Sequence, residues 1–136
     1  MVKTSLSGKK TIWIDHENFG YWVNTVHTVS ETQKEIVKSG IAGPILGHVG
    51  DGNFHAILLV DPENHKELKA AKSVAAKMAK LAIRLGGTCT GEHGIGMGKI
   101  DFMAYQHGHG WNVMGNIKEA LDPHNIMNPG KIIKRN

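Results

Sequence analysis

The chain has 136 residues and a net charge of +4, and its apolar and charged fractions, 40% and 21%, are typical of one globular domain rather than a disordered protein. Its lysines recur along one expected helix instead of forming a patch interleaved with aromatic side chains, which argues against a nucleic-acid partner. The single cysteine, Cys89, excludes an internal disulfide and fits a reducing compartment, and no apolar run approaches the ~20 residues of a membrane span.

The N-terminal part of the chain predicts a leader, a strand and a helix. Residues 1–10 are basic but lack arginine and a hydrophobic region, so we expect a flexible leader rather than a transit or signal peptide. Either 11–15 or 20–23 is a candidate for a short strand. From 24 to 38, valine and isoleucine recur at roughly helical spacing, and Gly40 is placed to end the helix.

Two apolar, β-branched runs, 44–48 and 54–60, then flank a Gly-Asp-Gly-Asn turn and predict a β-hairpin. With period-2 alternation, Leu46 and His48 share one face of the first run, as do His55 and Ile57 on the second. Pairing across the turn can therefore put both histidines on the same side of a sheet.

A long amphipathic helix is predicted after residues 61–64. Its start can be capped by Asp61, or by Asn64 with Glu67 three residues on. The apolar residues repeat at alternating spacings of three and four, and the lysines lie mostly off that stripe, on a face that we expect to be solvated. The stripe comprises Leu68, Ala71, Ala75, Met78, Ala82 and Leu85. Gly86 and Gly87 end the helix.

The C-terminal part contains a short strand candidate, 88–90, a glycine-rich segment, 91–98, and a poorly periodic stretch to Gly110. A last short helix carries Trp111, Met114, Ile117 and Leu121 on one face, and the tail that follows predicts an ordered turn. The order strand, helix, strand, strand, helix, short strand is the βαββαβ pattern of a ferredoxin-like α+β fold, an antiparallel sheet with helices on one face. The C-terminal helix and ordered tail are additions to it.

Two glycine-rich stretches carry the residues suited to chemistry. His48 and His55 lie in Gly47-His48-Val49-Gly50-Asp51-Gly52-Asn53-Phe54-His55, and Glu92 lies in 90–96. Two imidazoles and one carboxylate suit a divalent zinc, manganese or iron ion, with positions left open for water or substrate. Asp51 and Asn53 could orient the ligands or fix the turn. The alternative is that both histidines are ordinary strand residues beside a hairpin turn.

His93, next to Glu92, is the best candidate for a general base. Histidine exchanges protons near neutral pH, and a neighbouring cation would favour its neutral form, which can take a proton. Two other roles remain open for it, a third metal ligand or a loop histidine hydrogen-bonded to backbone.

Three segments, 47–55, 87–96 and 121–131, resemble in order the C-terminal domain of FAD-linked oxidases. The sequence is most similar to D-lactate dehydrogenases of the cytochrome type, and then to glycolate oxidase and D-2-hydroxyglutarate dehydrogenase. The resemblance implies oxidation of a D-2-hydroxy acid with hydride transfer to FAD. It implies a zinc or manganese ion held by His48, His55 and Glu92, His93 as the base, and Asn128 near the flavin.

The resemblance runs from about residue 26 to residue 133, so we expect an atypical leader, 1–23, followed by the oxidase C-terminal domain, 24–136. No segment resembles the family's N-terminal FAD-binding domain, and we expect a separate chain or a missing part to supply it. The implied partners are a small 2-hydroxy acid and an electron acceptor such as a cytochrome or electron-transfer flavoprotein. The implied location is mitochondrial in a eukaryote and otherwise cytoplasmic. The alternative function is a metal-binding or oligomerisation fragment that lacks flavin and catalyses nothing.

Overall fold

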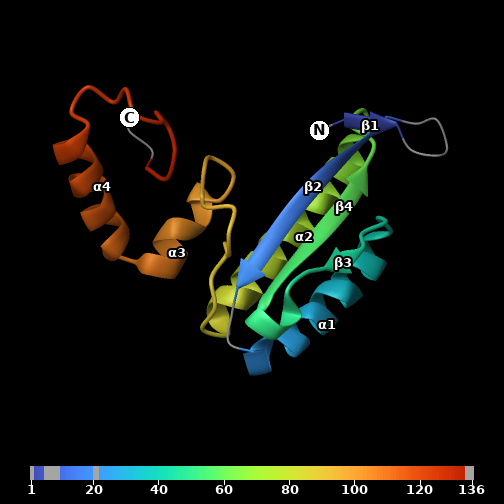
Figure 1. The fold of residues 1–136 in the computed structure, drawn as a ribbon. Coiled ribbons are helices and arrows are strands. Elements are labelled where there is room, and N and C mark those ends of the chain that lie inside the picture. Colours follow the sequence, from blue (N-terminus) through green and yellow to red (C-terminus); the bar gives the residue numbers. More distant parts are fainter. Residues whose placement is uncertain (1, 5–9, 20–21, 134–136) are drawn as a thin grey trace. The chain divides into compact units, whose positions relative to one another are not determined.

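The computed structural model describes residues 2–4, 10–19 and 22–133, and the chain divides into two compact units, Met1–Gly91 and Glu92–Asn136 (Figure 1). The first unit contains a four-stranded antiparallel sheet in the order β1-β2-β4-β3. Its strands are β1 (Val2–Thr4), β2 (Lys10–Phe19), β3 (Ile45–Leu46) and β4 (Asn53–Val60). The long central pair, β2 and β4, is in register from Ile12 opposite Val60 to Phe19 opposite Asn53.

Two helices, α1 (Trp22–Ser39) and α2 (His65–Arg84), cover one face of this sheet (Figure 1). Alternate residues of β4 point toward them, and the core forms where these side chains meet the helices. The buried members of the core are Ile36, Ile41, Phe54, Ala56, Leu58, Val60, Ala71, Val74 and Met78. The other residues of β4, which include Asn53 and His55, therefore belong to the opposite face of the sheet.

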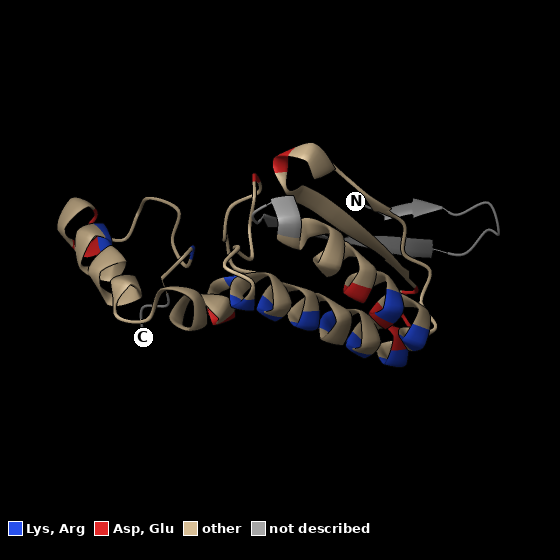
Figure 2. Cartoon of the chain, turned by 90° about the horizontal axis from the view of Figure 1, so that it is seen from below, with Lys and Arg blue, Asp and Glu red and all other residues tan. Residues whose placement is uncertain are grey.

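The start of α2 is the capping arrangement expected from the sequence. Asn64 accepts hydrogen bonds from the backbone N–H groups of Lys66 and Glu67 at 3.1 and 3.3 Å. Glu67 in turn accepts from the Asn64 side chain at 2.8 Å and from the Asp61 backbone at 2.9 Å. Figure 2 shows the lysines spaced along α2, and the side chains at 66, 69, 72, 77 and 80 are exposed, as expected for a solvated face.

The α+β fold class predicted from the sequence is confirmed, with three differences in detail. Of the two candidate first strands, 11–15 lies within β2, whereas Trp22 and Val23 begin α1 and residues 20–21 lie outside the described residues. The expectation of a flexible leader is wrong at Val2–Thr4, which pair with β2. The last strand of the pattern, 88–90, is reduced to a single bridge residue, Thr88.

The second unit contains a 3-10 turn (Ile100–Phe102) and two helices, α3 (Met103–His107) and α4 (Gly110–Leu121). The poorly periodic stretch before Gly110 is thus partly helical, which the sequence did not predict. The ordered tail is confirmed: Asp122 accepts from the backbone N–H groups of Ile126 and Met127, both at 2.9 Å, and Ile132 donates to Gly96 at 2.9 Å. Across the described residues, no helix combines the length and apolar character needed to cross a bilayer.

Candidate metal and substrate site

His55 lies near the start of β4, on the sheet face away from the helices. Its side chain is buried, with 8% of the residue exposed, and Asn53 beside it on the same face is 6% exposed. Leu46 of β3 and Glu17 of β2 are the residues opposite His55 in register. The sheet therefore holds the His55 backbone on both sides.

His48 lies outside the strands, because β3 ends at Leu46 and the chain turns through a 3-10 segment, Val49–Asp51. Its carbonyl accepts from the backbone N–H groups of Asp51 at 2.8 Å and Asn53 at 3.2 Å, and its side chain is exposed. The hairpin is thus formed as predicted, but its first strand ends at Leu46, the cross-strand partner of His55, and does not extend to His48 as the run 44–48 suggested.

The glycine at position 47, in the first glycine-rich stretch, has a steric reason. A Cβ atom there would lie 2.5 Å from the Cα of Phe54 and 2.7 Å from the carbonyl oxygen of Asn53. Both neighbours are backbone atoms of β4, so no rotamer change could relieve the overlap. The residue before His48 is therefore glycine because the two backbones approach each other closely there.

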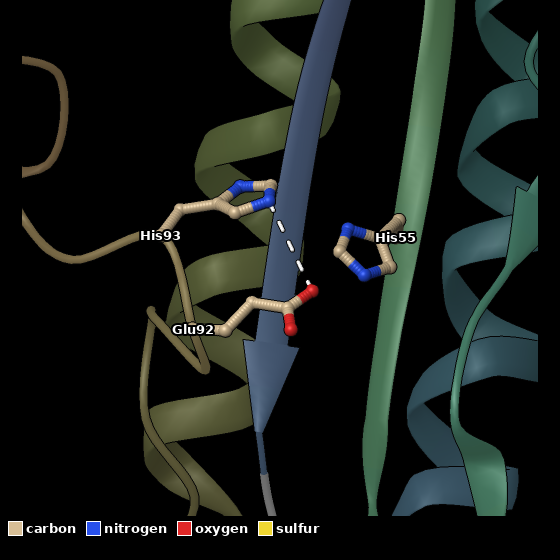
Figure 3. Close-up of side chains that lie close together, drawn as sticks. All are labelled: His55, Glu92 and His93. Atoms are coloured by element: carbon tan, nitrogen blue, oxygen red, sulfur yellow. Dashed lines mark ion pairs between the residues drawn. The ribbon is translucent and has the colours of Figure 1, made fainter.

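Glu92 and His93 begin the second unit, and they lie next to each other. The Nε2 atom of His93 is 4.0 Å from Oε1 of Glu92, and the two side chains are about half exposed, at 45% and 53%. This contact is an ion pair only when the imidazole is protonated. Figure 3 draws the pair as a dashed line, with His55 on β4.

The donor chemistry of these residues fits a divalent metal ion. Among the described residues, the His, Cys, Asp and Glu side chains that could together hold such an ion are His55, Glu92 and His93. Neutral imidazole nitrogen and carboxylate oxygen are common ligands of zinc and manganese. This group shares His55 and Glu92 with the ligand set expected from the sequence. It has His93, the expected base, where that set has His48.

Asn128 lies in the tail of the second unit, in a left-handed backbone conformation with φ of 46°. It lines a groove of about 330 Å³ that is otherwise mainly apolar. The remaining lining residues are Met114, Ile117, Lys118, Met127, Lys131, Ile132 and Ile133. Of the four α4 side chains predicted to share one face, Met114 and Ile117 thus border this groove, and α4 has no buried residue.

Two features of the site were not recognisable from the sequence. The groove beside Asn128 arises because the tail folds back over α4, where Trp111 donates to the carbonyl of Ile132 at 3.0 Å. The second feature is that Oδ1 of Asn53 is buried and has no hydrogen-bond partner within the described part of the chain, which costs about 1–3 kcal/mol in a protein interior. The motif placed Asn53 near the site but could not show that its oxygen is unpaired.

Several curated proteins named as dehydrogenases or oxidases are similar to this chain. It is 43% identical over 107 residues to the probable mitochondrial D-lactate dehydrogenase of Danio rerio, covering 78% of this chain and 22% of that protein. It is 39% identical over 106 residues to the mitochondrial D-lactate dehydrogenase (cytochrome) of Arabidopsis thaliana, covering 77% and 19%. It is 40% identical over 90 residues to the glycolate oxidase subunit GlcD of Bacillus subtilis, and the match covers 65% of this chain and 19% of that protein.

The chain spans about a fifth of the length of these curated relatives. Residues 21–132 match the family described as FAD linked oxidases, C-terminal domain. This match covers all three motif segments and continues almost to the end of the described residues. The chain therefore belongs to the C-terminal domain family of FAD linked oxidases.

Proposed function

We propose that this chain is the substrate- and metal-binding portion of an FAD-dependent D-2-hydroxy acid dehydrogenase, of the type that converts D-lactate to pyruvate. The observation that carries the proposal is the His55, Glu92 and His93 side-chain set within the family segment, 21–132. Relatives named D-lactate dehydrogenase share that segment at 39–43% identity. In the proposal FAD is held mainly by a flavin-binding domain outside these 136 residues, on the same polypeptide or on a separate one.

The proposed metal ligands are His48, His55 and Glu92, with zinc or manganese as the ion. Glu92 follows directly on Gly91, which belongs to the first unit and packs against Asn53 near the start of β4. Because adjacent Cα atoms are ~3.8 Å apart, chain connectivity keeps Glu92 close to the strand that carries His55. His48 is close to His55 in the sequence, and its side chain is exposed on the loop before β4. A divalent ion there would supply Lewis acidity toward the substrate hydroxyl.

His93 is the proposed base. In the oxidation, a ring nitrogen of His93 would take the proton of the substrate hydroxyl. Bound FAD would supply the acceptor for the hydride from the hydroxyl-bearing carbon, so that the O–H and C–H bonds break as the carbon–oxygen double bond of the 2-keto acid forms. The half-exposed imidazole of His93 would leave it accessible to substrate, in keeping with this role.

Metal content tests the ligand assignment. We expect the wild-type chain to bind about one zinc or manganese ion, and His55→Ala and Glu92→Gln to lose it, because each removes one of few ligands. Metal analysis after dialysis measures the content. His65→Ala is the matched control, since His65 is an exposed histidine at the start of α2. Wild-type content in His55→Ala would contradict the assignment.

Activity and metal content together distinguish the two roles open to His93. With a cognate flavin domain, His93→Ala should lower kcat at least ~100-fold, as removal of a general base does, and keep its metal. Loss of the metal as well would make His93 a ligand instead. His124→Ala, an exposed histidine of the same unit, is the control. Metal binding without any turnover in the wild type would favour the alternative function, a metal-binding fragment.

The proposed partner of the second unit is a flavin-binding domain, on the same chain or a separate one. Asn128 supplies an amide to a groove lined by Met114 and Ile117, and α4 exposes much apolar surface. A planar apolar ring edged by polar atoms suits such a groove. We expect this chain alone to show no flavin absorbance. With the flavin domain present, Asn128→Ala should shift the flavin spectrum, and an unchanged spectrum would place Asn128 away from the flavin.

The proposed electron acceptor is a cytochrome, because several relatives carry that word in their names, with an electron-transfer flavoprotein as the alternative. A mitochondrial location is proposed for a eukaryotic source on the same names. The acceptor is tested by D-lactate-dependent reduction of cytochrome c by the complex with its flavin domain. Reduction of an electron-transfer flavoprotein alone would exclude the cytochrome.

A further inference from the structure

Asn53 is a polar residue in a position that the fold itself does not require to be polar. It opens β4, and 6% of it is exposed. Its backbone contributes to the hairpin through the N–H group, which donates to the carbonyl of His48 at 3.2 Å. Any amino acid with an N–H group could make that bond. The side chain therefore needs a separate explanation.

The Asn53 carboxamide is packed against Gly91. A Cβ atom on residue 91 would lie 2.8 Å from Oδ1 of Asn53, 3.2 Å from Cγ and 3.4 Å from Nδ2. Gly91 is not in the left-handed backbone region, so its φ angle does not require glycine. A methyl group at position 91 would instead have to displace the Asn53 carboxamide, because it would overlap Oδ1.

Oδ1 of Asn53 is also buried, and none of the residues that the structure describes offers it a hydrogen bond. Buried polar atoms in folded proteins are nearly always paired, and an unpaired one is destabilising. An apolar side chain at position 53 would avoid this penalty. A residue that stability alone would not select, in contact with the chain one position before Glu92, indicates a role in the site.

We propose that Asn53 is a positioning residue, which holds Gly91 against the start of β4. It thereby fixes the point from which the backbone carrying the Glu92 carboxylate and the His93 imidazole continues. The inference rests on the proposed metal site. Asn53 sits two residues before His55 on the same face of β4, so one strand both provides a ligand and anchors the neighbouring loop. Residues that orient metal ligands commonly change metal affinity about 10–100-fold when they are removed.

A double-mutant cycle on the full chain tests the contact and its purpose. We expect Asn53→Ala to weaken Mn²⁺ binding about 10–100-fold, and Gly91→Ala to weaken it by a similar factor, measured by titration calorimetry. In the Asn53→Ala background, Gly91→Ala should add less than about twofold, because the overlapping oxygen is gone. Multiplicative losses in the double variant would overturn the proposal.

Two controls separate positioning from general stability. Thr32→Val removes a buried hydroxyl on α1 that, like Oδ1 of Asn53, has no hydrogen-bond partner among the described residues, and it should leave Mn²⁺ affinity unchanged. Gly50→Ala adds a methyl group where nothing lies within 4 Å, and should also leave it unchanged. The visible spectrum of the Co²⁺-loaded protein should change in Asn53→Ala, as altered ligand geometry requires. A wild-type spectrum would contradict the proposal.

Failure of this inference differs from failure of the proposed function. A wild-type chain that binds Mn²⁺, with an Asn53→Ala variant that binds it equally well, would overturn only the positioning role. A wild-type chain that binds no metal would overturn both the metal site and the role built on it. The packing of Asn53 on Gly91 is checked independently by the same cycle on urea unfolding of the metal-free proteins, where we expect the two substitutions to be non-additive.

Discussion

At the scale of single residues, Gly47 is a position where an added side chain would meet backbone at once. A methyl group at this position would overlap backbone atoms of both Asn53 and Phe54. We expect Gly47→Ala to lower the free energy of unfolding by about 1–3 kcal/mol, because overpacking against backbone has to move β4 or the loop. Urea denaturation measures the change. Gly50→Ala, in the same loop but with open space around it, should stay within about 0.5 kcal/mol, and an equal loss there would point to loop flexibility instead.

The stability of the C-terminal tail depends on pH through Asp122. Hydrogen bonds from the Lys118 ammonium and from the backbone N–H groups of Ile126 and Met127 lower the pKa of Asp122 to about 2. The folded pKa is below the unfolded value of ~3.9, so the carboxylate stabilises the fold above about pH 4. That contribution is lost as the pH falls from about 4 to about 2.

Amide hydrogen exchange at Ile126 and Met127 measures this dependence. We expect both amides to lose protection in the wild type as the pH falls through that window, once the rates are corrected for intrinsic exchange. Asp122→Asn should remove the dependence and leave the tail less protected at neutral pH. Glu119→Gln, an exposed acidic residue on α4, is the control. A pH profile in Asp122→Asn like that of the wild type would contradict the role given to Asp122.

The candidate site residues that could be predicted are those that lie close to one another in the sequence. His48 and His55 flank one glycine turn, and Glu92 and His93 are neighbours, so residue type and spacing were enough to single them out. The packing of Asn53 on Gly91 could not be predicted, because it joins residues far apart in the chain. The position of His48 depended on the length of β3, which alternation alone overestimates.

At the scale of elements, α2 is the segment best specified by local sequence. Asn64 and Glu67 satisfy each other's backbone and side-chain groups at its first turn. We expect Asn64→Ala to lower the free energy of unfolding by about 0.5–2 kcal/mol, because it leaves helix N–H groups without acceptors. Thermal or urea denaturation measures it, with Lys69→Ala on the exposed face as control. A loss no larger than that of the control would show that the cap contributes little.

The elements that the sequence mispredicted are those whose apolar residues do not repeat at a regular spacing. The strand β2 extends from Lys10 to Phe19, well beyond the 11–15 expected, because pairing with β4 imposes strand structure on polar residues that lack alternation. The short α3 follows a 3-10 turn and has Met103 as its one buried residue, too little for a recognisable apolar stripe. Thr88 makes only a single bridge, since glycines border its segment on both sides.

At the scale of the whole molecule, the two units differ in how much core they contain. The core cluster described for the first unit joins β4 to both helices, whereas α4 in the second unit buries no residue. Local stability follows buried apolar contact. We therefore expect the amides of β4 and α2 to exchange most slowly, at the rate of global unfolding, and those of α4 to exchange faster through local opening.

Hydrogen exchange followed by mass spectrometry measures this difference. Adding the flavin domain should slow exchange in α4 and leave β4 unchanged, because the exposed apolar residues of α4 would then be covered. Slow exchange of α4 in the isolated chain would show that the second unit is stable without a partner.

The edge of the sheet beside β4 has a consequence for the behaviour of the protein in concentrated solution. An eight-residue strand as apolar as β4 would, if its edge were free, be a template for aggregation with other chains. That edge is covered by residues 42–46: Ala42 and Pro44 accept from Leu59 and Ile57 at 2.8 and 3.0 Å, and β3 adds two paired residues. The covering segment contains a proline, which has no N–H group to offer a further strand. We therefore expect the segment leading to His48 also to hinder self-association of the chain through the edge of β4.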